Sequence, residues 1–393
     1  MGRSKRKSFS ITLILSIIFA VICIIAVWNV KVGDHEKGLQ PDYVEPETET
    51  MPYESIKPPT EEKTDKIIPE QEESEIDRVI DSPQVNEEDI EQEVTEAEKV
   101  VDAIDTELAQ TLNSFFKELN CHIGENWVID VPSIYSLTWI ERRLNNILAE
   151  SGYRIDNSKI YLNDKEILEL KFNKMPSKGK IAIIIDDVGR TTRLNTILQE
   201  IKLPLNISIL PKQRETTSMS TIGKKGGWDV LLHLPMEPKE KSWIDSTFIK
   251  VGMDSEEVKE RIDDYLKEMS YVQGVNNHMG SLATSDENIM RTVLGIVREK
   301  GLYFIDSLTI SNSIGEKVAG EIGLEKFAKR DIFLDNTDEK EYIRSQIDHL
   351  VELSIRKGFA IGIGHLRENT LTTIKDYDWN TKGVELVPLS DVL

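Results

Sequence analysis

The strongest constraint on the fold is the segment IAIIIDDVGR at residues 181–190, in which five apolar residues precede two adjacent carboxylates and a glycine. A short apolar run of this kind is typical of a strand buried on both faces, as in a parallel sheet with helices packed outside it. Because side chains alternate along a strand, Asp186 and Asp187 are expected to point in different directions, so that one binds a metal while the other faces the reacting centre. Alternatively, the two acids only begin a helix-capping turn.

The rest of the C-terminal half alternates between strand and helix patterns. The expected strands are residues 181–185, 206–210, 229–233, 272–276, 303–306, 332–334, 359–363 and 385–388. Two of the helices between them have readable starts, because Asp254 stands just ahead of an amphipathic run and Thr284 and Glu287 have the spacing of a capping box. Strands separated by helices imply parallel βα units. The pattern therefore predicts an α/β fold, either a barrel of TIM type or a close variant, or an open doubly wound sheet.

Residues 1–30 have the pattern of a membrane anchor. Arg3, Lys5, Arg6 and Lys7 precede residues 8–30, which carry no charge and are long enough to span a bilayer as a helix. The positive-inside rule then places the N-terminus in the cytoplasm and the rest of the chain outside it. A cleaved signal peptide is the alternative, but the apolar run is long and no small-x-small cleavage site follows it. We therefore expect a single-pass protein of the cell membrane with an extracytoplasmic catalytic domain.

Two further segments separate this anchor from the βα units. Residues 31–97 contain half of the chain's prolines and a large excess of acidic residues, so they are expected to form a disordered, extended linker. Residues 98–175 have the short strand and helix patterns of a small α/β domain, for which we identify no role. The main domain then occupies residues 176–393. The net charge of −21 argues against a nucleic-acid partner, because nothing supplies a basic groove for phosphates.

Polar residues fall at the ends of the expected strands, where the active site of a βα barrel lies. They are Asp186, Asp187, His233, Asn276, Asn277, His278, Asp306, Asp335 and His365. Three of the six histidines occupy such ends, although helices and linkers offered many more positions. Two imidazoles and one carboxylate, with a fourth position open for water, are the ligand set of a catalytic zinc or a similar divalent ion. We therefore expect Asp187, His233 and His278 to bind a divalent metal, with zinc as the expected ion.

Six ordered blocks of the sequence carry a family resemblance. They are IIIDDVGR (183–190), LLHLPMEP (231–238), GVNNHMGS (274–281), FIDSLT (304–309), RDIFLDN (330–336) and IGIGHL (361–366). Together they resemble the divergent polysaccharide deacetylase family, a distant branch of the polysaccharide deacetylases, over about residues 179–393. The resemblance implies a distorted (β/α) barrel of seven or eight strands, a divalent metal, and the removal of acetyl groups from N-acetylated sugars of a polymer.

The resemblance also implies roles for individual residues. In the better-known deacetylases, the first aspartate of the pair is the base and the second is a metal ligand, which here are Asp186 and Asp187. A late histidine that follows a hydrophobic-x pattern, here His365, is the general acid. The H-x-x-x-H pair and the Arg-x-Pro block of those enzymes are absent from this sequence. His233 and His278 are therefore expected to complete the metal site, and the substrate class is left open.

Further polar residues near the strand ends are expected to support this site. Glu237, Asp306 and Asp335 would orient the imidazoles or tune the acid, and Asn277 belongs to the same group of strand-end residues. Arg330 either pairs with one of these acids or contacts the substrate.

The sequence thus predicts a membrane-anchored, divalent-metal-dependent carbohydrate deacetylase. It would hydrolyse N-acetyl or O-acetyl groups of an envelope glycan, such as a peptidoglycan-type polymer, by means of a metal-activated water. One alternative is a catalytically inactive barrel that serves as a binding or scaffold module of the cell envelope. Another is a metal hydrolase of a different amide or ester, which would share the site and differ only in the pocket.

Overall fold

The computed structural model describes residues 106–191, 193–240 and 244–393, all of which belong to one compact unit, Lys66–Leu393. The expected anchor at residues 1–30, the expected linker at residues 31–97 and the start of the small domain lie outside the described residues. Within the described ranges, no helix is both long enough and apolar enough to cross a bilayer.

Nine parallel strands form the central sheet of the main domain. They are β7 (Lys180–Val188), β8 (Asn206–Ile209), β9 (Asp229–Met236), β10 (Gly274–Met279), β11 (Tyr303–Asp306), β12 (Phe327–Lys329), β13 (Ile332–Phe333), β14 (Phe359–His365) and β15 (Glu385–Leu386). Their order is β12-β11-β10-β9-β8-β7-β14-β13, and β15 pairs with β7. The α/β fold with a parallel sheet is therefore confirmed.

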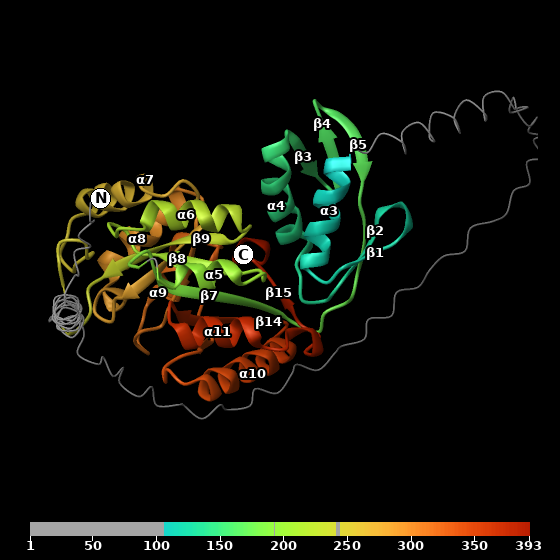
Figure 1. The fold of residues 1–393 in the computed structure, drawn as a ribbon. Coiled ribbons are helices and arrows are strands. Elements are labelled where there is room, and N and C mark those ends of the chain that lie inside the picture. The colour runs from blue at the N-terminus through green and yellow to red at the C-terminus, as the bar shows by residue number, and fades with distance from the viewer. Residues whose placement is uncertain (1–105, 192, 241–243) are drawn as a thin grey trace, which may run out of the picture. The chain divides into compact units, whose positions relative to one another are not determined.

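Helices cover the outer face of this sheet (Figure 1). They are α5 (Asn195–Glu200), α6 (Thr216–Lys225), α7 (Ser255–Lys267), α8 (Glu287–Glu299), α9 (Gly315–Ile322), α10 (Lys340–Lys357) and α11 (Glu368–Asp376). Ile181, Ile183 and Ile185 of β7 pack in the hydrophobic cluster shared with the helices, whereas Ala182 and Ile184 belong to a second cluster on the other face of the sheet. β7 is thus buried on both faces, as its apolar run predicts.

The two ends of the sheet approach each other in one short segment. β12 pairs with β11 and β13 pairs with β14, and only Arg330 and Asp331 separate β12 from β13 along the chain. No strand pairing within the described residues joins β12 to β13, so the sheet is curled but not closed by hydrogen bonds. The α-helices contribute residues to the hydrophobic cluster on one face of the sheet and none to the cluster on the other face. In a doubly wound sheet, helices would cover both faces. The architecture is a curled parallel half-barrel with eight strands along the path from β12 to β13 and β15 paired beside β7, which is consistent with a distorted barrel.

Strand ends differ from the expected boundaries. Four strands run further at their carboxyl ends than the apolar pattern indicates, because β7 continues to Val188, β9 to Met236, β10 to Met279 and β14 to His365. Asp186, His233, His278 and His365 therefore belong to paired strands, and the ladder fixes their backbone positions. Glu237, Arg330 and Asp335 lie in the connections just beyond or between strands.

The two expected helix starts have different outcomes. Asp254 caps α7 by accepting a backbone N–H three residues further on, at 2.8 Å, as predicted. The predicted capping box of Thr284 and Glu287 is wrong. Thr284 lies in a 3₁₀ turn and donates its hydroxyl to the carbonyl of Gly280, and Asp286 is the residue that caps α8.

Residues 106–174 form two helices and two three-stranded sheets. The elements are α3 (Thr106–Glu118), β1 (His122–Ile123), β2 (Val128–Val131), α4 (Leu137–Leu148), β3 (Tyr153–Asp156), β4 (Lys159–Leu162), β5 (Lys165–Glu169) and β6 (Lys171–Lys174). One sheet has the order β1-β2-β6 and the other β3-β4-β5. β1 has only two residues and shows no period, whereas the residues of β3 alternate between buried and exposed positions.

Helix α4 attaches this part of the chain to the main domain. Arg142 forms ion pairs with Asp229, at 2.9 Å, and with Asp391, at 3.1 Å. Asp229 is fully buried at the start of β9 and also accepts the hydroxyl of Tyr303 at 3.1 Å. The larger hydrophobic cluster contains residues of both parts. The attachment therefore lies at the amino ends of the strands, opposite the carboxyl ends where the expected site residues gather.

Candidate metal centre and its surroundings

A β-bulge at the end of β7 changes the direction of its two carboxylates. The register of β7 against β8 shifts between Ile185 and Val188, and Asp187 has a left-handed φ of 62°. This conformation costs a non-glycine residue on the order of 1–2 kcal/mol, and such strain clusters at functional sites. Instead of pointing to opposite faces, Asp186 and Asp187 approach the same nitrogen, Nε2 of His233, at 3.7 and 3.4 Å. The bulge removes the strand alternation that the sequence predicts here.

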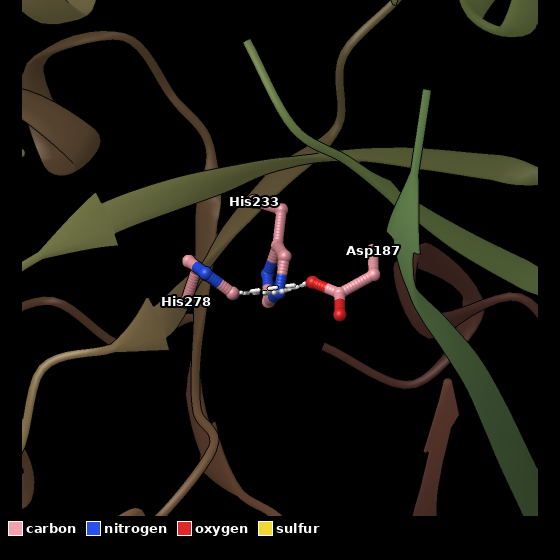
Figure 2. Close-up of side chains that lie close together, drawn as sticks. All are labelled: Asp187, His233 and His278. Carbon is pink, nitrogen blue, oxygen red and sulfur yellow. Dashed lines mark hydrogen bonds and ion pairs between the residues drawn. The ribbon is translucent and has the colours of Figure 1, made fainter. Parts of the chain in front are cut away.

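The three expected metal ligands meet at the carboxyl ends of β7, β9 and β10. Nδ1 of His278 lies 3.2 Å from Oδ1 of Asp187 and 3.2 Å from Nε2 of His233. The distance between Oδ1 of Asp187 and Nε2 of His233 is 3.4 Å. Figure 2 shows the carboxylate turned toward both rings. Ligand atoms about 2.1 Å from a zinc ion lie about 3.0–3.4 Å from each other at octahedral to tetrahedral angles. This is the one group among the described residues in which three or more potential ligands come together.

The oxygen at the centre of these contacts has no hydrogen-bond partner. Oδ1 of Asp187 is buried, and neither imidazole approaches it with hydrogen-bond geometry. A buried unpaired acceptor costs about 1–3 kcal/mol. Burial alone would raise the pKa of Asp187, but the charge of His278 and the nearby nitrogen of His233 hold that pKa well below its ordinary value. An ionised oxygen that faces two imidazole nitrogens fits a divalent cation.

A polar network holds the opposite side of the His233 ring. Its Nδ1 lies 2.9 Å from Oδ1 of Asn276, and the same oxygen accepts the hydroxyl of Ser208. The Nδ2 group of Asn276 donates to Oδ1 of Asp186 at 2.9 Å. All four side chains are buried. Asn276 was noted as a polar residue at a strand end but was not among the residues expected to support the site, and Ser208 was not noted at all.

The environment of Asp186 suits a proton acceptor. Burial raises the pKa of Asp186 above its ordinary value, against the opposing charges of His233 and His365 and the hydrogen bond from Asn276. A carboxylate of raised pKa is a stronger general base than an exposed one. Asp186 is not one of the three residues that could hold a metal, although its carboxylate lies beside them.

His365, which is partly exposed, pairs with the fully buried Asp335. Nδ1 of His365 donates to Oδ1 of Asp335 at 2.8 Å, and the other carboxylate oxygen accepts the His365 backbone N–H at 2.7 Å and the hydroxyl of Thr370 at 2.6 Å. Phe333 stacks on the imidazole with ring centroids 5.9 Å apart. Burial would lower the pKa of His365, but the bond to Asp335 and its charge raise that pKa to about 9. The ring is therefore an imidazolium at neutral pH and can donate a proton.

The other four expected residues bind the loops around the site. Glu237 accepts a backbone N–H of the loop between β9 and α7 at 2.8 Å. Asn277 binds the backbone at the ends of β10 and β11 at 2.7 and 2.8 Å. Asp306 accepts a backbone N–H and a hydroxyl of the loop after β11 at 2.8 and 2.5 Å, and Arg330 donates to two carbonyls of that loop at 2.8 and 3.1 Å. These residues stabilise the loops around the three candidate metal ligands.

Strand alternation explains which polar residues reach the ligands. Asn276 and His278 are two residues apart on β10 and share a face, so Asn277 between them points to the other face. The alternation of side chains along the strand therefore indicated that Asn276 lies on the same face as His278, but we did not expect a supporting role for Asn276. Ser208 had no such signal, because a serine within a short buried strand has no ligand chemistry of its own.

The chain is similar to known proteins in sequence and in fold. The sequence model of the divergent polysaccharide deacetylase family matches residues 183–393. A Haemophilus influenzae protein is 32% identical over 199 residues, which are 51% of this chain and 71% of that protein. The protein YibQ of Escherichia coli is 32% identical over 216 residues, which are 55% and 67% of the two chains.

A crystal structure of a protein from Agrobacterium tumefaciens is similar to this chain with a TM-score of 0.53. It is 18% identical and covers 56% of this chain and 90% of its own. At this level of identity the likeness concerns the fold alone.

Proposed function

We propose, since this chain belongs to the divergent polysaccharide deacetylase family, that its main domain is a metal-dependent hydrolase that removes acetyl groups from a carbohydrate polymer. The observation that carries the proposal is the trio of Asp187, His233 and His278, whose ligand atoms lie 3.2–3.4 Å apart around an oxygen without a hydrogen-bond partner. Two imidazoles and one carboxylate are ligands typical of a catalytic zinc site, so zinc is the proposed ion.

Asp186 is the proposed base. A divalent ion held by the trio would supply a water of lowered pKa and would polarise the acetyl carbonyl. Asp186 then accepts a proton from the attacking water, and its burial, which raises its pKa, makes it a better acceptor than an exposed aspartate. The amide of Asn276 donates to Oδ1 of Asp186, which leaves Oδ2, the oxygen nearer to His233, available for the water.

His365 is the proposed general acid. The bond between the acetyl carbonyl carbon and the leaving nitrogen breaks as that nitrogen takes up a proton. Because Nδ1 of His365 is bound to Asp335, the proton comes from Nε2. A pKa of about 9 keeps this proton in place at neutral pH. The products are acetate and a free amine, or an alcohol if the acetyl group is an ester.

We also propose an acetylated envelope glycan as the substrate and the cell membrane as the location. The uncharged segment at residues 8–30 and the acidic, proline-rich segment at residues 31–97 support an anchor followed by a spacer. This topology would leave the main domain outside the cytoplasm, where such glycans occur.

Bound metal tests the proposal most directly. The full chain, purified in detergent, should contain close to one equivalent of zinc by elemental analysis and should release acetate from N-acetylated oligosaccharides. Asp187→Asn and His278→Gln should lose both the metal and the activity. His349→Gln is the matched control, because His349 is exposed on α10 and should leave both unchanged.

Two results would favour the alternatives. Folded protein that takes up no metal would favour a non-catalytic binding scaffold. A metal-loaded protein that releases no acetate from any glycan would favour a hydrolase of another amide or ester.

A further inference from the structure

A single buried amide connects a metal ligand to the proposed base. Asn276 has no exposed surface and makes four polar contacts. Its Nδ2 donates to Oδ1 of Asp186 at 2.9 Å and to the hydroxyl of Ser307 at 3.3 Å. Its Oδ1 lies 2.9 Å from Nδ1 of His233 and accepts the hydroxyl of Ser208. A side-chain amide has two donor hydrogens and two acceptor lone pairs, so its hydrogen-bonding capacity is fully used.

The carboxylate of Asp186 determines which way this amide faces. Turning the amide of Asn276 over would place its oxygen against Oδ1 of Asp186, so that two acceptors face each other. Each buried group left unpaired in this way costs about 1–3 kcal/mol. The nitrogen therefore faces Asp186, and the oxygen faces His233.

This orientation in turn determines the proton on the imidazole. An amide oxygen only accepts hydrogen bonds, so Nδ1 of His233 must be the nitrogen that carries hydrogen. The lone pair of the neutral ring is then on Nε2. Nε2 is the atom that lies 3.4 Å from Asp187 and 3.2 Å from His278, where the cation would bind.

We propose that Asn276 is a positioning residue that couples the base to the metal site, holding His233 in the tautomer that binds the cation through Nε2. Ser208, on β8, which pairs with the strand that carries His233, supports this role by donating to the same amide oxygen. The coupling means that Asp186 affects metal affinity without being a ligand. The inference rests on the proposed function, because it assigns the cation to Asp187, His233 and His278.

Zinc affinity of the full chain, measured by competition with a chromophoric chelator, tests this coupling. Asn276→Leu should weaken zinc binding by about 10–100-fold, the usual effect of losing a residue that orients a metal-binding histidine. Ser208→Ala should weaken it severalfold and is less disruptive to folding. The matched control is Ser220→Ala, because Ser220 is a buried serine on α6 that binds the backbone of Ser270 and should leave zinc affinity unchanged.

A double-mutant cycle separates the coupling from simple charge effects. Asp186→Asn removes both a negative charge near the cation and the carboxylate that orients the amide. In the parent chain both losses weaken zinc binding, whereas in the Asn276→Leu background only the charge effect remains. The loss of affinity caused by Asp186→Asn should therefore be smaller in that background.

Nitrogen-15 labelling of the histidines gives a readout that a purely structural role would not change. The zinc-loaded chain should show an Nδ1–H proton on His233 that exchanges slowly with water. Asn276→Leu should lose this protected signal while the chain remains folded.

The outcomes distinguish the two proposals. A parent chain that binds no zinc overturns both. Equal zinc affinity in the parent, Asn276→Leu and Ser208→Ala chains, or a protected Nε2–H on His233, overturns the positioning role alone. Zinc binding that depends on Asn276 without acetate release supports the positioning role and overturns the deacetylase.

Discussion

Replacing Asp335 by asparagine should lower the pH at which activity is lost. Asp335 is fully buried and accepts Nδ1–H of His365 at 2.8 Å. Burial would lower the pKa of His365, but the hydrogen bond to Asp335 and its charge, followed by the charges of Asp187 and Asp186, raise that pKa to about 9. Asparagine keeps the size and one acceptor of the side chain but removes its charge. The activity requires the protonated ring, so it is present below the pKa of His365 and lost above it.

The expected magnitude follows from the ordinary pKa of an imidazole. That value is about 6.5, so the environment raises the pKa of His365 by roughly 2.5 units, or about 3 kcal/mol. If the whole shift were lost, the imidazolium fraction would fall from about 91% to about 3% at pH 8, a loss of about thirtyfold, and would change little at pH 6. Asp186 and Asp187 remain in the variant and continue to favour the charged ring. We therefore expect the alkaline limb of the pH–activity profile, where activity falls as the pH rises, to move to a pH lower by about one to two units.

Acetate release measured between pH 5.5 and 10 tests this prediction. The charge of a bound cation lowers the limb in parent and variant alike, so the difference between them is the quantity to compare. Thr370→Val is the matched control, because it removes a hydroxyl that donates to the same carboxylate and leaves the charge in place. Its limb should stay within about half a unit of the parent. Coincident limbs for folded Asp335→Asn and parent chains would refute His365 as an acid tuned by Asp335.

Three further predictions concern the metal, the attachment of the small domain and the anchor. Adding zinc at 100 times its dissociation constant to chelated protein should stabilise it by about 2.7 kcal/mol in calorimetry, and the Asp187→Asn chain should not respond. Arg142→Ala leaves Asp229 buried without its cation and should cost about 2–3 kcal/mol in urea unfolding, whereas Lys212→Ala, at an exposed ion pair, should cost under about 1 kcal/mol; equal costs would contradict the buried attachment. Protease added to intact spheroplasts should digest the main domain, and deletion of residues 1–30 should release it from membranes; a protected domain would contradict the proposed orientation.

The strands were predictable where their sequence was apolar, whereas the short strand β12, at one end of the curled sheet, was not. Five consecutive apolar residues predict β7, and its burial on both faces follows from that pattern. β12 has only three residues and no period that the sequence can display, so it was not predicted, whereas the two residues of β13 lie within the strand expected at residues 332–334. β12 pairs with β11 and β13 pairs with β14, although only Arg330 and Asp331 separate β12 from β13 along the chain. The incomplete closure of the barrel is therefore a tertiary feature, set by strand pairing rather than by local pattern.

The proximity of Asp187, His233 and His278 was predictable because parallel strands place their carboxyl ends at one edge of the sheet, whereas their binding of a metal stays a prediction. His233 and His278 are 45 residues apart, and only the pairing of β9 with β10 brings them together. The orienting contacts were not predictable, since they depend on the face to which each side chain points. Asn276 shares the face of His278 and reaches the site, whereas Asn277 turns to the neighbouring loop. The bulge at Asp187 was hidden for a similar reason, because nothing in a run of apolar residues and acids signals a left-handed φ.

The order of the strands gives the proposed reaction a direction. β9 and β10, which carry His233 and His278, lie on one side of β7, and β14, which carries His365, lies on the other. His365 is the direct partner of Asp186 in the β14–β7 register, so the acid and the base lie next to each other across one pair of strands. An acetamide group bound over Asp186 would then place its carbonyl oxygen toward the metal ligands and its nitrogen toward His365. The sugar, which is attached through that nitrogen, would have to lie over the β14 side. Changes in sugar preference are therefore expected from substitutions beyond β14 and β13, and changes in metal preference from substitutions on β9 and β10.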